Sequence, residues 1–222
     1  MKNKTIVNNW YYFLLIIPVL SAIIALINGN FFFKSGSAGG GILILSILYR
    51  KKLLQDRSVW MIIAAFLFSI AGDWFLSHRN GDANRFIYGI ALFFFAHLGY
   101  LFYSLLNGRI HWIATVVILL GFLLFFIVAL YPHIDDKILM IAALIYLIIS
   151  CFSLGAALGI KLPTGSKWLF VSGIILILFS DTIIALKEFA GYRMLDFLIL
   201  PTYYLAHIGI TISLMRRKSL TE

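Results

Sequence analysis

Residues 59–77 read VWMIIAAFLFSIAGDWFLS, an almost unbroken apolar run with a single charged residue, Asp73. A membrane-spanning helix needs about 20 residues of this kind. Similar runs recur along the chain, in which 62% of the 222 residues are apolar and 12% are charged. Because a soluble domain is about 45–50% apolar and about 25% charged, the composition excludes one and indicates a polytopic membrane protein.

The chain contains eight apolar runs separated by short polar segments. They cover residues 10–27, 37–49, 59–77, 85–106, 111–131, 137–158, 167–186 and 194–215. We expect each run to form a transmembrane α-helix of an all-α fold. No linker interrupts the series, so residues 1–222 should form a single transmembrane domain. The short second run begins with small residues, Gly36 to Gly41, which suit close contact between helices.

Basic residues are in excess and give the chain a formal net charge of +9. They lie between the apolar runs and not along one face, which favours a role in membrane orientation over nucleic-acid binding. With the N-terminus inside, the inner segments hold 12 Lys and Arg residues and the outer segments hold 6. The positive-inside rule then places both termini in the cytoplasm. The first run lacks a convincing signal-cleavage site, so we expect an integral protein of a bacterial inner membrane.

Two aspartates and two histidines recur at matching places in the two halves of the chain. Asp73 and Asp181 are 108 residues apart, and His97 and His207, each within an Ala-His-x-Gly element, are 110 residues apart. This echo is consistent with two four-helix halves in parallel orientation, related by internal duplication, or with chance similarity of apolar helices. At about 1.5 Å per residue, both aspartates should lie in the outer third of the membrane. There they could converge with the histidines on one cavity.

An aspartate within a membrane helix is costly, since its insertion at the centre costs about 2.5–3.5 kcal/mol. It therefore faces the bundle interior or water and has a partner. One such aspartate could merely cap a helix or bind a tyrosine hydroxyl, but two at matched depth favour function. Other polar side chains align with them: His97 and Tyr100 share one helix face, and Tyr203 and His207 share another.

Charged residues near the outer ends of the spans could bind a polar head group. Arg85, Lys187 and Arg193 would lie near the mouth of a cavity that contains both aspartates, where they could bind the phosphate of an amphiphile. The candidate substrate-binding residues are His97, Tyr100, Tyr203, Tyr204, His207, Ser180, Arg85, Lys187 and Arg193.

At these residues the chain resembles the YhhN family of membrane lysoplasmalogenases. The matching elements lie, in order, in residues 72–76, 95–100, 178–185 and 202–206. Each element is short, but four in order within a chain of this length are specific. The chain departs from the family pattern at His207, where Gln is common, and after Lys34, where the family often has a proline and this chain has Ser35.

The resemblance implies a hydrolase that cleaves the sn-1 vinyl ether of a lysoplasmalogen to a fatty aldehyde and a glycerophospho-base. It also implies that Asp73 and Asp181 are the catalytic residues. The reaction requires protonation of the β-carbon and addition of water to the oxocarbenium ion. One carboxylic acid can supply the proton and one carboxylate can stabilise the cation, as paired carboxylates do in glycosidases. The expected partners are a lysophospholipid and the bilayer, with no cofactor.

Three alternatives use the same residues. The first is a proton-coupled carrier or lipid-binding membrane protein that uses the aspartate pair. The second is a metal-dependent intramembrane hydrolase with both aspartates and both histidines as ligands; the single cysteine, Cys151, excludes a cysteine-ligated zinc site. The third is a structural membrane protein, since buried polar pairs also determine how helices pack.

Overall fold

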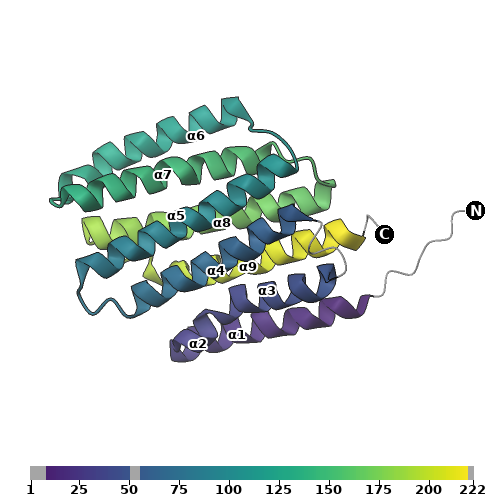
Figure 1. Cartoon of the computed structure of the whole chain (residues 1–222). Helices are drawn as coiled ribbons and strands as arrows, with labels where there is room; N and C mark the ends of the chain where they lie inside the picture. Colours follow the sequence, from purple (N-terminus) through teal and green to yellow (C-terminus); the bar gives the residue numbers. More distant parts are fainter. Residues whose placement is uncertain (1–8, 51–55, 220–222) are drawn as a thin grey trace, which may run out of the picture.

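The computed structural model describes residues 9–50 and 56–219, which form a bundle of long helices (Figure 1). Every secondary-structure element within these residues is a helix, and none is a strand. One isolated bridge pairs Gly108 with Ile160 between two neighbouring connections. The all-α fold that the sequence predicts is confirmed.

Eight helical segments cross the bundle along the described residues. In order they are η1 (Asn9–Leu15) with α1 (Ile16–Asn28), α2 (Phe31–Lys34) with α3 (Gly36–Tyr49), α4 (Arg57–Ser77), α5 (Ala83–Leu106), α6 (Trp112–Phe125) with η2 (Phe126–Leu130) and η3 (Tyr131–His133), α7 (Lys137–Leu158), α8 (Thr164–Ala190) and α9 (Asp196–Ser219). Seven of them are long and apolar enough to span a membrane. Their bounds match the predicted runs to within a few residues, so the chain is a polytopic membrane protein.

The second crossing is the exception, because α3 alone is shorter than a membrane span. The helix α2 precedes it, and backbone hydrogen bonds continue through the joint at Ser35. The glycines of α3 bring it close to its neighbours. A Cβ atom at Gly36 would lie 2.4 Å from Ser21 Cβ, and one at Gly41 would lie 2.5 Å from Phe66 Cε2. The predicted close contact of these small residues is therefore confirmed.

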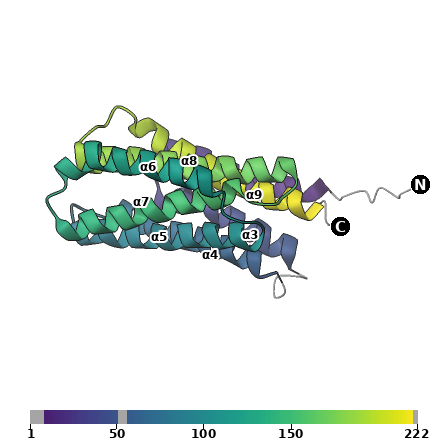
Figure 2. The ribbon, with the colours of Figure 1, turned by 90° about the horizontal axis from the view of Figure 1, so that it is seen from above.

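Helix packing repeats between the two halves of the chain. In the first half α4 packs along α5, and in the second half α8 packs along α9. The helix α3 contacts α4 of its own half and α9 of the other half. In the same way, α7 contacts α8 of its own half and α5 of the other half. The outer helices α1 and α6 contact α3 and α7, respectively, so the order from either edge of the bundle to its centre is the same (Figure 1). Seen from above, the α4–α5 and α8–α9 pairs form opposite layers (Figure 2). This arrangement agrees with two four-helix halves in parallel orientation.

The repeated Ala-His-x-Gly elements make matching contacts in the two halves. Gly99 of α5 lies against the carbonyl oxygen of Met61 on α4, and Gly209 of α9 lies against that of Leu169 on α8. Met61 and Leu169 are 108 residues apart, the same offset that separates the two aspartates. The echo in the sequence thus corresponds to equivalent helix neighbours in the structure, with the closer approach at Gly99.

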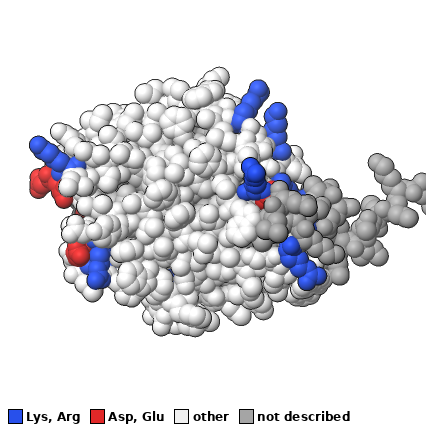
Figure 3. Space-filling view, in the orientation of Figure 1, with Lys and Arg blue, Asp and Glu red and all other residues white. Residues whose placement is uncertain are grey.

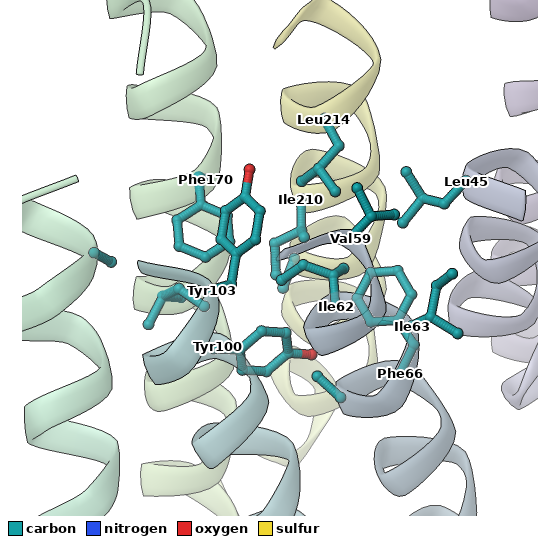
Figure 4. Close-up of a cluster of buried hydrophobic side chains, with 14 of the residues drawn as sticks. Leu45, Val59, Ile62, Ile63, Phe66, Tyr100, Tyr103, Phe170, Ile210 and Leu214 are labelled. Atoms are coloured by element: carbon teal, nitrogen blue, oxygen red, sulfur yellow. The ribbon is translucent and has the colours of Figure 1, made fainter. Parts of the chain in front are cut away.

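Large side chains fill the half of the bundle nearest the chain ends. Figure 4 shows Phe66, Ile62 and Tyr100 packed between α4, α5 and α9, with Phe170 of α8 beside Tyr103. These buried side chains belong to the largest hydrophobic cluster of the described residues.

On the face shown in Figure 3, charged side chains gather at the two ends of the bundle and leave a belt without charged residues between them. The first and last described helices, η1 and α9, begin and end at the same end of the bundle (Figure 1). The membrane side on which that end lies remains a prediction from the positive-inside rule. Four of the cations counted for it, Lys2, Lys4, Lys51 and Lys52, lie outside the described residues.

Candidate functional site

Asp73 of α4 and Asp181 of α8 line one cavity of about 300 Å³ near the end of the bundle opposite the chain ends. We call this cavity the polar chamber. Its charged lining residues are Lys34, Asp73, Arg79, Asp181, Lys187, Glu188 and Asp196. Ser77, Ser180, Tyr203 and Tyr204 add hydroxyl groups to its wall. Two aspartates from equivalent helices of the two halves therefore meet in one chamber.

A narrower apolar pocket of about 80 Å³ lies between α5, α6, α7 and α8, beside the polar chamber. Residues that line this pocket alone include Ile90, Phe122, Phe125, Leu130, Ala143, Leu147, Leu178, Ala185 and Phe189. The residues common to both cavities are Leu76, Phe86, Phe93, Asp181 and Ile184. Asp181 is thus the charged side chain at the boundary between a charged and an apolar compartment.

Asp181 is oriented by side chains from two other helices. The Tyr146 hydroxyl of α7 donates a hydrogen bond to Asp181 Oδ2 over 2.5 Å. His97 of α5, which is buried, places Nε2 3.6 Å from the same oxygen. The other oxygen, Oδ1, remains for a ligand, a proton or water.

Tyr146, which contacts Asp181, is a residue of the candidate site that the sequence alone did not single out. The signal was present, because Tyr146, Ser150 and Ser153 form a polar stripe at helical spacing within an otherwise apolar run. The Ser150 hydroxyl donates to the Tyr146 carbonyl, and both residues line the apolar pocket.

Asp73 has a different environment. It lies within electrostatic range of Lys34 on α2, Tyr203 on α9 and Asp181. Tyr203 and Tyr204, which are both candidate binding residues, line the polar chamber. Asp73 therefore belongs to the charged compartment alone, whereas Asp181 belongs to both.

Ser180 and Lys187 also line the polar chamber. The Ser180 hydroxyl donates to the carbonyl oxygen of Ile199 over 3.1 Å and so ties α8 to α9. Lys187 pairs with Asp196 over 3.2 Å. The structure thus brings these two predicted residues to the site, although each already has a partner in the protein.

His97 and four other candidate residues line neither cavity. Tyr100 and His207 are fully buried below the chamber, where the His207 ring contacts Phe66 and Tyr203 at centroid distances of 4.9 and 4.4 Å. The Tyr100 ring lies 5.9 Å from that of His97. These contacts give His207 a place in helix packing rather than in the chamber wall.

The other two are the outer arginines. Arg85 lies 3.8 Å from Asp82 and donates a hydrogen bond to the carbonyl oxygen of His78. Arg193 is exposed in the connection between α8 and α9. Their helix-end positions were predicted correctly, but their side chains do not line the cavities.

Buried polar atoms without a hydrogen-bond partner concentrate around the aspartates. Within the described part of the chain these include both ring nitrogens of His97 and His207 and the hydroxyls of Tyr100, Tyr203 and Tyr204. Such groups cost about 1–3 kcal/mol each when buried, and native proteins retain few of them. The hydroxyls of Tyr203 and Tyr204 belong to the wall of the polar chamber, where a ligand could supply their missing partners.

Two ion pairs frame the rim of the polar chamber. Arg79, after α4, pairs with Glu188 of α8, and Lys187 of α8 pairs with Asp196 of α9. All four side chains line the chamber. The sequence alone does not predict these two pairs, because the partner of each residue depends on how the helices meet.

The residues on which the metal-dependent alternative depends do not form a ligand set. Among residues 9–50 and 56–219, no three His, Cys, Asp or Glu side chains lie close enough together to hold a metal ion. His97 lies near Asp181, but His207 contacts aromatic rings instead. Cys151 is buried on α7 as a free thiol.

Comparison with known families adds one match. The sequence profile of the YhhN family matches residues 32–214. The matched region runs from α2 into α9 and contains every residue that lines the two cavities. Neither the curated proteins nor the solved structures provide a match.

Proposed function

The chain belongs to the YhhN family, and from that premise we propose that it is a membrane hydrolase that cleaves the sn-1 vinyl ether bond of lysoplasmalogens. The products are a fatty aldehyde and a glycerophospho-base. The observation that carries the proposal is the position of Asp181 on the boundary between the polar chamber and the apolar pocket. In a lysoplasmalogen the vinyl ether occupies the corresponding position, between the polar head group and the hydrocarbon chain.

The two cavities fit an amphiphile in one direction only. The polar chamber, with seven charged lining residues, accepts the glycerophosphate part. The apolar pocket, walled by phenylalanines and aliphatic side chains, accepts the first part of the chain. The reverse orientation would bury a phosphate among apolar groups, at a large desolvation cost. The scissile bond then lies beside Asp181.

Position also divides the chemistry between the two carboxyl groups. The β-carbon of the vinyl ether lies on the chain side of the oxygen, so Asp181, which borders the apolar pocket, is placed to protonate it. The Tyr146 hydroxyl and His97 then stabilise the carboxylate that remains. Asp73, in the polar chamber, stabilises the oxocarbenium ion and takes a proton from the attacking water.

The remaining steps balance without a redox partner. Water adds to the carbon that carries the ether oxygen and gives a hemiacetal. The hemiacetal then loses its hydroxyl proton to the departing glycerol oxygen, and the carbon–oxygen bond to glycerol breaks. One vinyl ether and one water become one aldehyde and one alcohol, and a proton exchange between the two aspartates restores the starting state.

The direct test is aldehyde release by purified protein in detergent, from a lysoplasmalogen and from the matching sn-1 ester lipid. Wild-type protein is compared with Asp73→Asn and Asp181→Asn, which keep the side-chain shape. Asp135→Asn is the matched control, because Asp135 is exposed at the same end of the bundle and lines neither cavity. We expect aldehyde from the vinyl ether alone, lost in both site variants and retained in the control.

Isotope labelling separates this reaction from other ways of releasing an aldehyde. In D₂O, product that is trapped as it forms should carry one deuterium on the carbon next to the carbonyl. Saturable lipid binding by folded wild-type protein, with no aldehyde from any head group, would instead favour the carrier or lipid-binding alternative.

A further inference from the structure

Three cations line the polar chamber, but they are not equivalent. Arg79 is paired with Glu188, and Lys187 is paired with Asp196. Lys34 forms no ion pair and donates no side-chain hydrogen bond within the described part of the chain, although it lies within electrostatic range of Asp73. Its positive charge is therefore the one in the chamber wall that rim carboxylates leave uncompensated.

Local structure holds Lys34 at this position. The chain leaves α1 through Gly29, whose φ of 66° suits glycine, and the Asn30 side chain caps α2 by accepting a hydrogen bond from Phe32 N. Phe33 packs against the buried cluster that contains Tyr203 and Tyr204. The half-buried Lys34 follows directly, so α2 anchors the lysine beside the two tyrosines of the chamber.

We propose that Lys34 is the binding residue for a phosphate ester in the polar chamber. This inference rests on the proposed function, in which the chamber receives the head group of a lysophospholipid. A phosphate placed in the polar chamber needs a cation of its own, because the Asp73 carboxylate on the same wall repels it. An ammonium group at hydrogen-bond distance from phosphate oxygens supplies that attraction. Lys34 would then be a positioning residue, which sets how far the lipid enters.

A purely electrostatic role toward Asp73 leads to a different expectation. If Lys34 only balanced the charge of Asp73, its loss would affect every substrate equally, whether or not it carried phosphate. If Lys34 binds phosphate, its loss affects phosphate-bearing ligands and leaves phosphate-free ligands unchanged. Ligands that differ only in the phosphate group therefore separate the two roles.

The experiment measures binding in detergent, so that it does not require catalysis. The probes are a 1-O-alkyl lysophospholipid, whose saturated ether cannot be cleaved by protonation of a double bond, and the matching 1-O-alkylglycerol. Both are titrated into wild-type protein, Lys34→Gln and Lys34→Arg. The matched control is Lys137→Gln, because Lys137 is exposed near the same end of the bundle and lines neither cavity.

We expect Lys34→Gln to weaken binding of the phospholipid by about tenfold or more, the value of a charge-assisted hydrogen bond. Binding of the alkylglycerol should not change, Lys34→Arg should restore most of the affinity, and Lys137→Gln should match wild type. Equal weakening of both probes, or no weakening of either by Lys34→Gln, would overturn the inference. Competition with glycerol 3-phosphate distinguishes a lipid head group from a free phosphate ester as the ligand, since a site for a free phosphate ester would bind this competitor although it lacks a hydrocarbon chain.

Turnover in the same variants keeps this inference distinct from the proposed function. If wild-type protein binds the phospholipid through Lys34 but releases no aldehyde, the phosphate site stands and the hydrolase proposal fails. If wild-type protein releases aldehyde and Lys34→Gln lowers kcat for phosphate-bearing and phosphate-free vinyl ethers alike, the hydrolase proposal stands and the phosphate site fails.

Discussion

The hydroxyl of Tyr146 on α7 donates to Asp181 Oδ2 on α8 over 2.5 Å, beside the boundary between the polar chamber and the apolar pocket. The bond joins two consecutive helices and fixes the position of one oxygen of the Asp181 carboxyl group. His97, 3.6 Å away on α5, approaches the same oxygen from another helix. The geometry leaves Oδ1 as the oxygen that can face a substrate.

Removal of this hydrogen bond should slow the chemical step. We expect Tyr146→Phe to lower kcat by about tenfold, since a hydrogen bond to a charged group is worth about 1.5–3 kcal/mol, and to leave KM within about twofold. The matched control is Tyr88→Phe, because Tyr88 is exposed on α5 and contacts Phe75. Aldehyde release at several substrate concentrations gives both constants. Unchanged kcat in Tyr146→Phe would show that the hydroxyl has no part in the reaction.

The two histidines, equivalent in sequence, should differ in function. Neither histidine lines a cavity, but His97 lies close to Asp181, whereas His207 contacts the rings of Phe66 and Tyr203. We expect His97→Leu to lower kcat by about tenfold. His207→Leu should keep kcat within about threefold, because the His207 ring contacts Phe66 and Tyr203 and not Asp181. Equal loss in both variants would contradict this distinction.

The fold could be predicted from the sequence because each span is an independent run of apolar residues, and membrane insertion depends on run length. The meeting of Asp73 and Asp181 could also be anticipated, since the two residues lie similarly far along their apolar runs and so at similar depths in the membrane. The side chains that contact these two aspartates could not be predicted. The polar stripe of Tyr146, Ser150 and Ser153 indicates an inward face, but it does not reveal that Tyr146 contacts Asp181, which depends on how α7 and α8 pack. Arg85, expected near the mouth of a cavity, lines neither cavity.

The apolar pocket predicts a dependence on chain length. Ala185 lines this pocket, and a larger side chain there would occupy space that the first methylene groups of the substrate need. We expect Ala185→Phe to lower kcat/KM at least about tenfold for a long-chain lysoplasmalogen, with a smaller loss for a short-chain analogue. The control is Ala91→Phe, because Ala91 is exposed on α5. An equal loss for both chain lengths would indicate general damage rather than a filled pocket.

The orientation of the bundle can be tested by cysteine labelling. Asn80 is exposed at the end that carries the polar chamber, and Thr164 is exposed at the end where α9 finishes. In a background in which the buried Cys151 is replaced by Ala, a membrane-impermeant thiol reagent should label Asn80→Cys in intact cells. It should label Thr164→Cys only after permeabilisation, if the chain ends are cytoplasmic. The opposite pattern would place the chamber on the inner side.

The repeated glycines allow the packing of the two halves to be compared by one matched pair of substitutions. A Cβ atom at Gly99 would lie 2.6 Å from the Met61 carbonyl oxygen, closer than van der Waals contact allows, whereas one at Gly209 would lie 3.5 Å from that of Leu169. Gly99→Ala must therefore push α5 away from α4, and we expect a destabilisation of about 1–3 kcal/mol. Gly209→Ala should be neutral or stabilising by up to about 1 kcal/mol, because alanine favours a helix. Thermal unfolding of the two variants in the same detergent measures the difference. A lower Tm for Gly209→Ala than for Gly99→Ala would show that the α8–α9 contact, and not the α4–α5 contact, is the tighter of the two.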